Sequence, residues 1–176
     1  QFFPFSSFLN SVDNLIDDWW LMIDDWWLMI NELGSVAFVC MANYCRSPVA
    51  KALLKNKFNN QLKVDSAGIN PIVSAGMDSR SISYLKDNNQ FCEIHTPKKI
   101  DKNFLNSSNI VFAMDTSILM YLNKTYKNHR NKFKLFTYQH RNIQIQDPYK
   151  LSKEKYKIVM DEIKFVVDHF RLEELC

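Results

Sequence analysis

From Ser35 onward the sequence alternates between short apolar runs and longer segments with helical periodicity, and this alternation limits the available folds more than any other feature. The apolar runs predict buried strands, and the segments between them predict helices. The predicted strands are 36–39, 62–66, 110–114 and 133–136, and the predicted helices are 48–58, 79–86, 116–122 and 152–172. This order predicts a three-layer α/β/α fold, in which helices cover both faces of a four-stranded parallel sheet.

Residues 1–34 differ from residues 35–176, and we predict an N-terminal extension followed by one domain. The extension has six acidic residues and no Lys or Arg, and its segment IDDWWLM at 16–22 is repeated unchanged at 23–29. On a helix the acids would form a narrow stripe beside Trp, Leu, Met and Ile. The segment is either a duplication that stays disordered or a helix that docks on the domain, on a second copy or on a membrane surface. Self-association through this extension is therefore one expectation.

The composition of the remaining chain narrows its partners and its compartment. Residues 35–176 hold all 22 Lys and Arg residues but only 13 of the 19 acidic residues, which suits an anionic partner such as a phosphorylated protein. The sequence contains no nucleic-acid recognition motif, no stretch long enough to span a bilayer and no spacing typical of metal ligands. Four irregularly spaced cysteines predict a reduced, cytoplasmic compartment. We expect no cofactor or metal.

The loop between the first predicted strand and helix has the residues of an anion-binding site. Backbone N–H groups of such a loop and of the first helical turn form a nest for an anion. Arg46 adds a planar fork that can hold two phosphate oxygens. The same positive field favours thiolate over thiol at Cys40, and the hydroxyl of Ser47 could donate to that thiolate. A lone cysteine at a strand end would be interpreted as a buried apolar residue, but this setting favours a nucleophile.

The segment VCMANYCRSPVA resembles the phosphate-binding signature of the low-molecular-weight protein-tyrosine phosphatases, and the resemblance extends over about residues 36–170. It implies that Cys40 is the nucleophile and that Arg46 binds the phosphate. Asn43 matches an asparagine whose left-handed backbone shapes the loop, and Ala42 stands where many members have Gly. The resemblance implies that the loop consists of Met41, Ala42, Asn43, Tyr44 and Cys45, and that its polar support comes from Ser47, Ser66, His95 and Asp115.

The segment Gln146-Asp147-Pro148-Tyr149 resembles the acid loop of the same family. Asp-Pro is also a frequent turn starter, but this pair falls after the fourth strand and before the last helix, as in the family. The resemblance implies that Asp147 is the general acid and base, and that Tyr149 and Tyr44 form an aromatic wall for a phenyl ring.

Taken together, these residues predict hydrolysis of protein phosphotyrosine through a cysteinyl phosphate. The resemblance also implies a reversible disulfide between Cys40 and Cys45 that protects the nucleophile. The segment INPIVSA at 69–75 contains no Trp or Tyr, which is similar to bacterial members, some of which act on tyrosine kinases.

Two alternatives use the same fold. A thioredoxin-coupled arsenate reductase would need a relay cysteine just after the third strand. Met114 and Asp115 occupy that position, and Cys92 comes before the strand. A phosphotyrosine-binding scaffold on an inactive phosphatase fold is disfavoured because every catalytic group is present.

Overall fold

A computed structural model of the chain describes residues 34–140 and 144–171. The predictions for the N-terminal extension, including its docking and self-association, lie outside the described residues. Among the described residues, no helix combines the length and the apolar character that crossing a membrane requires.

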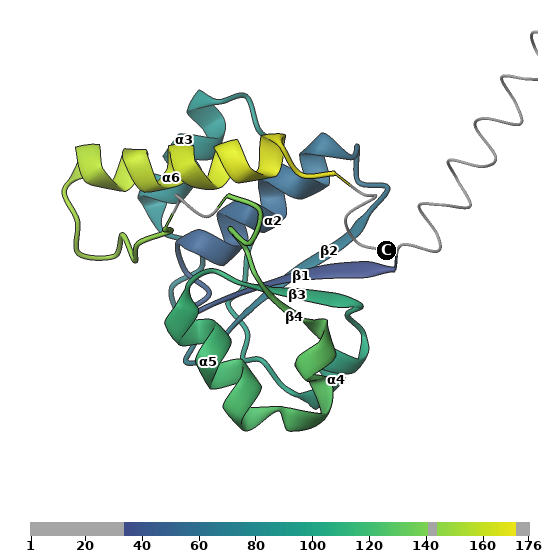
Figure 1. Cartoon of the computed structure of the whole chain (residues 1–176). Coiled ribbons are helices and arrows are strands. Elements are labelled where there is room, and N and C mark those ends of the chain that lie inside the picture. Colours follow the sequence, from purple (N-terminus) through teal and green to yellow (C-terminus); the bar gives the residue numbers. More distant parts are fainter. Residues whose placement is uncertain (1–33, 141–143, 172–176) are drawn as a thin grey trace, which may run out of the picture. The chain divides into compact units, whose positions relative to one another are not determined.

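The centre of the fold is a sheet of four parallel strands in the order β2-β1-β3-β4 (Figure 1). The strands are β1 (Ser35–Cys40), β2 (Lys63–Gly68), β3 (Ile110–Ala113) and β4 (Phe133–Leu135). Every residue of β1 and β3 is buried, as expected for inner strands of a parallel sheet that is covered on both faces. Because all four strands are parallel, their carboxyl ends meet at one edge, where ligands bind in folds of this kind.

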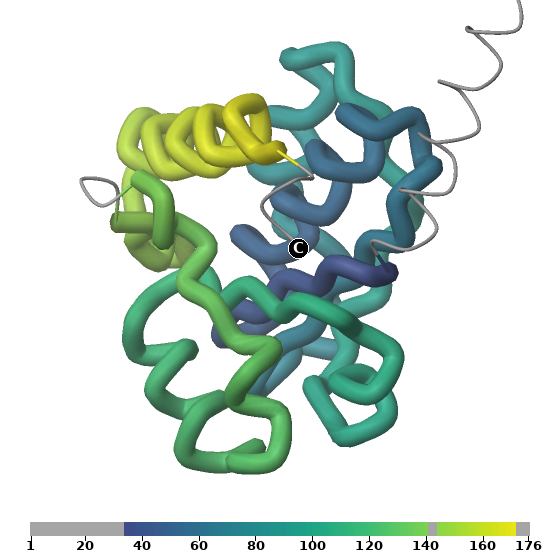
Figure 2. Tube along the Cα trace, turned by 45° about the vertical axis from the view of Figure 1, so that its right-hand side comes forward, coloured from purple at the N-terminus to yellow at the C-terminus, as the bar shows by residue number. Residues whose placement is uncertain are grey.

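Helices cover both faces of the sheet, which confirms the predicted α/β/α fold class (Figure 1). One face carries α2 (Arg46–Lys57), α3 (Ser79–Asp87) and α6 (Lys153–Asp168), and the other carries α4 (Lys102–Asn106), α5 (Thr116–Thr125) and the 3₁₀ helix η1 (Lys127–Lys132). Although α2 and α6 are far apart in sequence, α6 lies against α2 and α3 (Figure 2).

The alternation of side chains along β1 decides where the thiol of Cys40 lies. Val36, Phe38 and Cys40 belong to the core on the side of α2 and α6, whereas Ala37 and Val39 belong to the core on the side of α5. The side chain of Cys40 therefore lies on the sheet face that α2 covers, and α2 begins six residues later. A short loop is enough to place the thiol near the amino end of that helix.

The last helix ends earlier than the sequence pattern predicts. The prediction of a helix to residue 172 is wrong, because α6 ends at Asp168. The ammonium of Lys57 donates to the carbonyl oxygens of Val167, Asp168 and Phe170 at 2.8, 2.7 and 2.7 Å. These bonds satisfy carbonyl groups that a continuing helix would otherwise have paired. The sequence also gave no sign of α4 or η1, which are too short for a periodic pattern.

Candidate active site

The loop of residues 41–45 joins β1 to α2 at the carboxyl edge of the sheet and curls around the sulfur of Cys40. Asn43 has a φ of 50°, the left-handed conformation that asparagine tolerates better than most residues. This conformation directs the backbone N–H of Asn43 to Cys40 Sγ at 3.2 Å. On the helix side, the hydroxyl of Ser47 lies 3.0 Å from the same sulfur. Two hydrogen-bond donors therefore converge on the sulfur of Cys40.

Asn43 holds the loop together with its side chain and its carbonyl group. Its Nδ2 donates to Ser47 Oγ at 2.9 Å and to Ser66 Oγ at 3.0 Å, and its Oδ1 accepts from the backbone N–H of Lys98 at 2.9 Å. Its carbonyl oxygen accepts from His95 Nε2 at 2.8 Å. Because Ser47 Oγ accepts from Asn43, its hydroxyl proton is available to the sulfur at 3.0 Å, and the only other acceptor described for it is the Ala67 carbonyl oxygen at 3.5 Å.

The hydrogen bond from His95 fixes the tautomer of its ring. A carbonyl oxygen can only accept, so Nε2 of His95 carries the proton. Burial lowers the pKa of His95, and nearby Lys51 adds to this effect, against the opposing bond to the Asn43 carbonyl. The ring therefore supports the loop as a neutral imidazole near physiological pH.

Arg46, the first residue of α2, is buried and lies between two carboxylates. Its Nη1 donates to Asp115 Oδ2 and its Nη2 donates to Asp147 Oδ2, both at 2.7 Å. Asp115 is fixed in turn because its Oδ1 accepts from the backbone N–H of Ile118 and caps α5 at 2.8 Å. A buried guanidinium needs such partners to offset the loss of hydration. Arg46 thus links the ends of β1 and β3 to the segment that carries Asp147.

The mouth of the site is a hollow that opens between the loop and the Asp147 segment. The rings of Tyr44 and Tyr149 meet edge to face there, with centroids 6.0 Å apart and an interplanar angle of 72°. The backbone N–H of Tyr149 donates to Asp147 Oδ1 at 3.2 Å. The hollow is lined by Cys40, Met41, Ala42, Tyr44, Cys45, Arg46, Asn70, Ile72, Asp147 and Tyr149. A thiol at the floor, a cation at the side, a carboxylate at the rim and aromatic rings at the mouth suit the transfer of a phosphoryl group from an aryl ester.

Comparison with known proteins identifies this arrangement. Residues 35–175 match the family model described as low molecular weight phosphotyrosine protein phosphatase. The chain belongs to this family. The low molecular weight protein-tyrosine-phosphatase Wzb of Escherichia coli (strain K12) is 30% identical over 125 residues, which are 71% of this chain and 84% of that protein. The family and the phosphatase class predicted from the sequence are thereby confirmed.

Solved structures agree with the fold. The tyrosine phosphatase Wzb from Escherichia coli K30, in complex with sulphate, matches with a TM-score of 0.75 at 24% identity, over 81% of this chain and 99% of that one. The YwlE arginine phosphatase from Geobacillus stearothermophilus matches with a TM-score of 0.71 at 25% identity, over 81% and 92% of the two chains.

Gly68 is a residue of this phosphatase whose role the sequence did not reveal. A Cβ atom at Gly68 would lie 2.8 Å from Asn43 N, 2.9 Å from Ala42 C and 2.9 Å from Met41 O. The end of β2 can approach the loop only without a side chain. The segment after Gly68 then donates three backbone N–H groups to carbonyl oxygens of residues 40–42, at 2.8–3.2 Å. These bonds tie the loop carbonyl groups to the end of β2.

Cys45 is the last residue of the loop, and its side chain lies beside the carboxylate of Asp78. Its thiol donates to Asp78 Oδ2 at 3.6 Å. Burial, supplemented by the negative charge of Asp78, raises the pKa of Cys45 to about 12, although a hydrogen bond with Tyr156 opposes the shift. The second cysteine of the loop is therefore a thiol in the resting protein.

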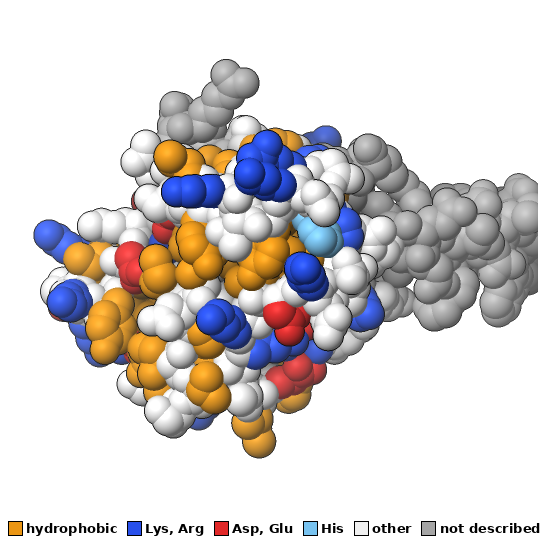
Figure 3. Space-filling view, turned by 90° about the horizontal axis from the view of Figure 1, so that it is seen from below, with side chains coloured by type: hydrophobic (Ala, Val, Ile, Leu, Met, Phe, Trp, Pro, Cys, Tyr) orange, Lys and Arg blue, Asp and Glu red, His pale blue; other side chains and the backbone are white. Residues whose placement is uncertain are grey.

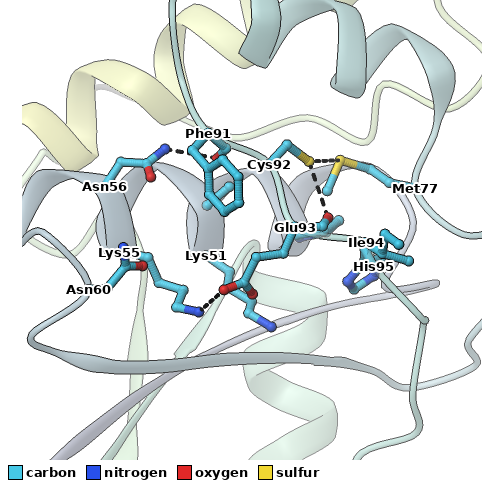
Figure 4. A pocket seen from close by; sticks show the side chains of 12 residues that line it. Lys51, Lys55, Asn56, Asn60, Met77, Phe91, Cys92, Glu93, Ile94 and His95 are labelled. Atoms are coloured by element: carbon cyan, nitrogen blue, oxygen red, sulfur yellow. Dashed lines mark hydrogen bonds and ion pairs between the residues drawn. The ribbon is translucent and has the colours of Figure 1, made fainter.

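A second, small hollow lies between α2 and residues 91–95, and His95 is among the residues that line it (Figure 4). Cys92 faces Met77 Sδ there at 4.0 Å, and Lys55 pairs with Glu93 at 2.6 Å.

The position at the end of β3, which an arsenate reductase would need for a relay cysteine, is occupied by Met114 and Asp115. No group of three or more metal-ligating side chains occurs among residues 34–140 and 144–171.

The surface on the side of α4 and α5 bears Lys and Arg side chains scattered among apolar ones (Figure 3). A nucleic-acid site usually shows a stripe or patch of clustered basic residues. On this face of the described chain the basic residues do not form one stripe.

Proposed function

We propose that this protein hydrolyses phosphotyrosine in proteins through a phosphorylated cysteine, Cys40. The observation that carries the proposal is the pair of donors on Cys40 Sγ, from the Asn43 N–H at 3.2 Å and from Ser47 Oγ at 3.0 Å. Hydrogen bonds to an ionised group are stronger than those to a neutral one, so both donors favour the thiolate. The thiolate is the nucleophilic form of cysteine.

In the first step the thiolate of Cys40 attacks phosphorus, and the S–P bond forms as the bond from phosphorus to the tyrosine oxygen breaks. A phosphate dianion replaces Asp147 as the acceptor of the hydrogen bond from Arg46 Nη2, while Asp115 still accepts from Nη1. This exchange frees the Asp147 carboxylate, which is half exposed, takes up a proton from solvent and gives that proton to the leaving oxygen. Without that proton the tyrosine would leave as a phenolate, whose conjugate acid has a pKa of about 10.

In the second step Asp147 acts as the base. It takes a proton from a water molecule, which attacks phosphorus and breaks the S–P bond. Inorganic phosphate leaves, and the thiolate of Cys40 is restored. The same side chain serves both steps because it has lost its proton in the first one.

The aromatic mouth supports an aryl substrate. The Tyr44 and Tyr149 rings form a wall beside the hollow, and a flat phenyl ring packs well against such edges. The name of the Escherichia coli relative, a protein-tyrosine-phosphatase, agrees with this choice, whereas the Geobacillus relative is named an arginine phosphatase. We take phosphotyrosine proteins as the substrate class, with a bacterial tyrosine kinase as one such partner.

The test combines a substrate panel with trapping of the intermediate. We expect phosphotyrosine peptides to be hydrolysed much faster than matched phosphoserine or phosphoarginine peptides. Rapid acid quenching followed by peptide mapping should recover phosphate on Cys40. The Cys92→Ser variant should give the same map, because Cys92 lines the second hollow and not the one that holds Cys40. A preference for phosphoarginine, thiol-dependent reduction of arsenate, or phosphate on another residue would contradict the proposal.

We also propose that Cys40 and Cys45 form a reversible disulfide under oxidation. Peroxide oxidises the Cys40 thiolate to a sulfenic acid, and the Cys45 sulfur then displaces water to form the S–S bond. Because Cys45 has a pKa of about 12, closure should be slow near neutral pH and faster as the pH rises.

Mild peroxide should therefore inactivate the protein, and added thiol should restore its activity. Peptide mapping should find Cys40 joined to Cys45, and the Cys45→Ser variant should lose the recovery. The Cys92→Ser variant is the control and should recover as the wild type does. A bond between Cys40 and Cys92, or sulfonic acid alone, would speak against this pairing.

A further inference from the structure

Asp78 is a buried carboxylate outside the proposed chemistry, and it is tied to Arg80 two residues later. Asp78 Oδ1 accepts from the backbone N–H and from Nε of Arg80 at 2.8 and 3.0 Å, and Oδ2 accepts from Nη2 at 2.8 Å. Burial raises the pKa of Asp78, but the hydrogen bonds from Arg80 outweigh it and hold the pKa below its ordinary value. Asp78 therefore remains ionised and forms a two-pronged pair with Arg80.

The opposite side of the Arg80 guanidinium reaches the segment that carries Asp147. Its Nη2 donates to the carbonyl oxygen of Tyr149 at 3.0 Å, and its Nη1 donates to that of Leu151 at 3.1 Å. The guanidinium carbon lies 4.0 Å from the centroid of the Tyr156 ring, at the start of α6. All three nitrogens of the fork thus have acceptors, and two of those acceptors are backbone groups just after Asp147.

Asp78 in turn contacts the loop around Cys40. Its backbone N–H donates to the carbonyl oxygen of Tyr44 at 3.0 Å, and its Oδ2 accepts from the thiol of Cys45 at 3.6 Å. Asp78 and Arg80 therefore form a continuous bridge from the loop that holds the nucleophile to the segment that holds the acid. Tyr149 completes it, since its N–H donates to Asp147 Oδ1 at 3.2 Å.

We propose that Arg80 is a positioning residue for Asp147, and that its bridge through Asp78 sets the separation between Asp147 and Cys40. The inference rests on the proposed role of Asp147 as the general acid. Arg80 does not line the hollow, so it acts on the reaction only through the backbone that it holds. The planar fork places these donors better than a lysine would, because a single ammonium cannot serve Asp78 and two carbonyl oxygens in the same geometry.

The expected effect follows from the step that needs Asp147. Displacing a reacting group by about 1 Å can cost about 100-fold in rate. We therefore expect Arg80→Ala to lower kcat/KM for phenyl phosphate by about 10- to 100-fold. The loss for an aryl phosphate with a strongly acidic phenol should be severalfold at most, because such a phenol leaves without a proton. Inhibition by inorganic phosphate should change less than in Asp147→Asn, because Arg46 and the loop residues are not replaced and Asp147 keeps its charge.

The experiment compares kcat/KM across a series of aryl phosphates whose phenols differ in pKa. This parameter covers the steps up to departure of the phenol, so it reports on protonation by Asp147. The enzymes are the full-length wild type, Arg80→Ala, Arg80→Lys, Asp147→Asn and the double variant Arg80→Ala/Asp147→Asn. In Arg80→Ala, kcat/KM should fall more steeply as the pKa of the phenol rises than it does in the wild type. Arg80→Lys should show a smaller increase in this steepness. In the double variant, the steepness should equal that of Asp147→Asn alone.

Lys132→Met is the matched control. Lys132 also ties two backbone carbonyl groups, those of Leu105 and Ser108, both at 2.8 Å, but it lies just before β4, at the amino end of that strand. Its loss should lower the melting temperature without changing how kcat/KM depends on the pKa of the phenol. This separates the loss of a structural clamp from the loss of acid positioning.

Two results would overturn the inference. One is an equal loss for all leaving groups in Arg80→Ala and Arg80→Lys, and the other is a further steepening when Arg80→Ala is added to Asp147→Asn. A flat response of Asp147→Asn itself would instead remove the proposed general acid. If Arg80→Ala does not fold, Arg80→Lys alone must steepen the dependence, and failure to do so overturns the inference.

Discussion

Replacement of Cys40 by serine is expected to lower kcat for an aryl phosphate by at least about 10³-fold while the fold is retained. The change removes the thiolate but keeps almost the same volume at a buried position. The donors from Asn43 and Ser47 can still bond to the new hydroxyl group, so no buried polar atom is left without a partner. The measurement is steady-state turnover, with circular dichroism and the melting temperature as checks of the fold.

The same variant also separates catalysis from binding. Arg46 and the loop amides are unchanged in Cys40→Ser, so inorganic phosphate and phosphotyrosine peptides should still bind. Cys92→Ser, a Cys-to-Ser change at a partly buried site outside the hollow, should keep wild-type turnover. Turnover of Cys40→Ser above about one per cent of the wild type would contradict the covalent mechanism and would favour a different nucleophile.

The sheet and its edge could be predicted because their signals are local. The apolar runs at Val36 and Ile110 are short and continuous, which distinguishes buried parallel strands from amphipathic helices. Once the strands are parallel, the carboxyl ends of β1, β3 and β4 must meet at one edge, and these ends or the segments that follow them carry Cys40, Asp115 and Asp147. The meeting of Arg46 with both acids is thus a consequence of topology, although no spacing in the sequence shows it directly.

The contacts that shape the loop could not be predicted from local patterns. The tight approach of Gly68 to the loop depends on the register of β2 against β1, in which Gly68 stands opposite Cys40. The bond from the Lys98 backbone to Asn43 comes from an irregular segment with no periodicity. The pair of Asp78 and Arg80 resembles an ordinary helix cap in the sequence, since Asp is a common capping residue. Only the folded chain reveals that Arg80 also holds the carbonyl groups after Asp147.

Arg46 explains why the resting site is poised for an anion. Its two carboxylate partners differ in freedom, because Asp115 also caps α5, whereas Asp147 is half exposed on an irregular segment. We therefore expect an incoming phosphate to displace Asp147 more easily than Asp115. In the proposed mechanism the displaced carboxyl group would stay beside the leaving oxygen, so binding of the substrate would also release the acid.

Asp147→Asn should therefore have two opposite effects. An amide cannot give a proton to the leaving oxygen, so kcat/KM for phenyl phosphate should fall by about 10²- to 10⁴-fold, with a much smaller loss for a strongly acidic phenol. At the same time Arg46 loses the carboxylate that competes with phosphate for Nη2. Inorganic phosphate should therefore inhibit the variant severalfold more strongly than it inhibits the wild type.

The matched control is Asp168→Asn, because Asp168 is as exposed as Asp147 and also pairs with a cation, Lys164, at 2.5 Å. It lies at the end of α6, so its loss should change neither the dependence on phenol pKa nor the inhibition by phosphate. Both measurements need only kcat/KM across aryl phosphates and a phosphate inhibition series. An equal loss across all leaving groups would show that Asp147 is not the acid. Unchanged inhibition by phosphate would show that Arg46 does not exchange Asp147 for the substrate.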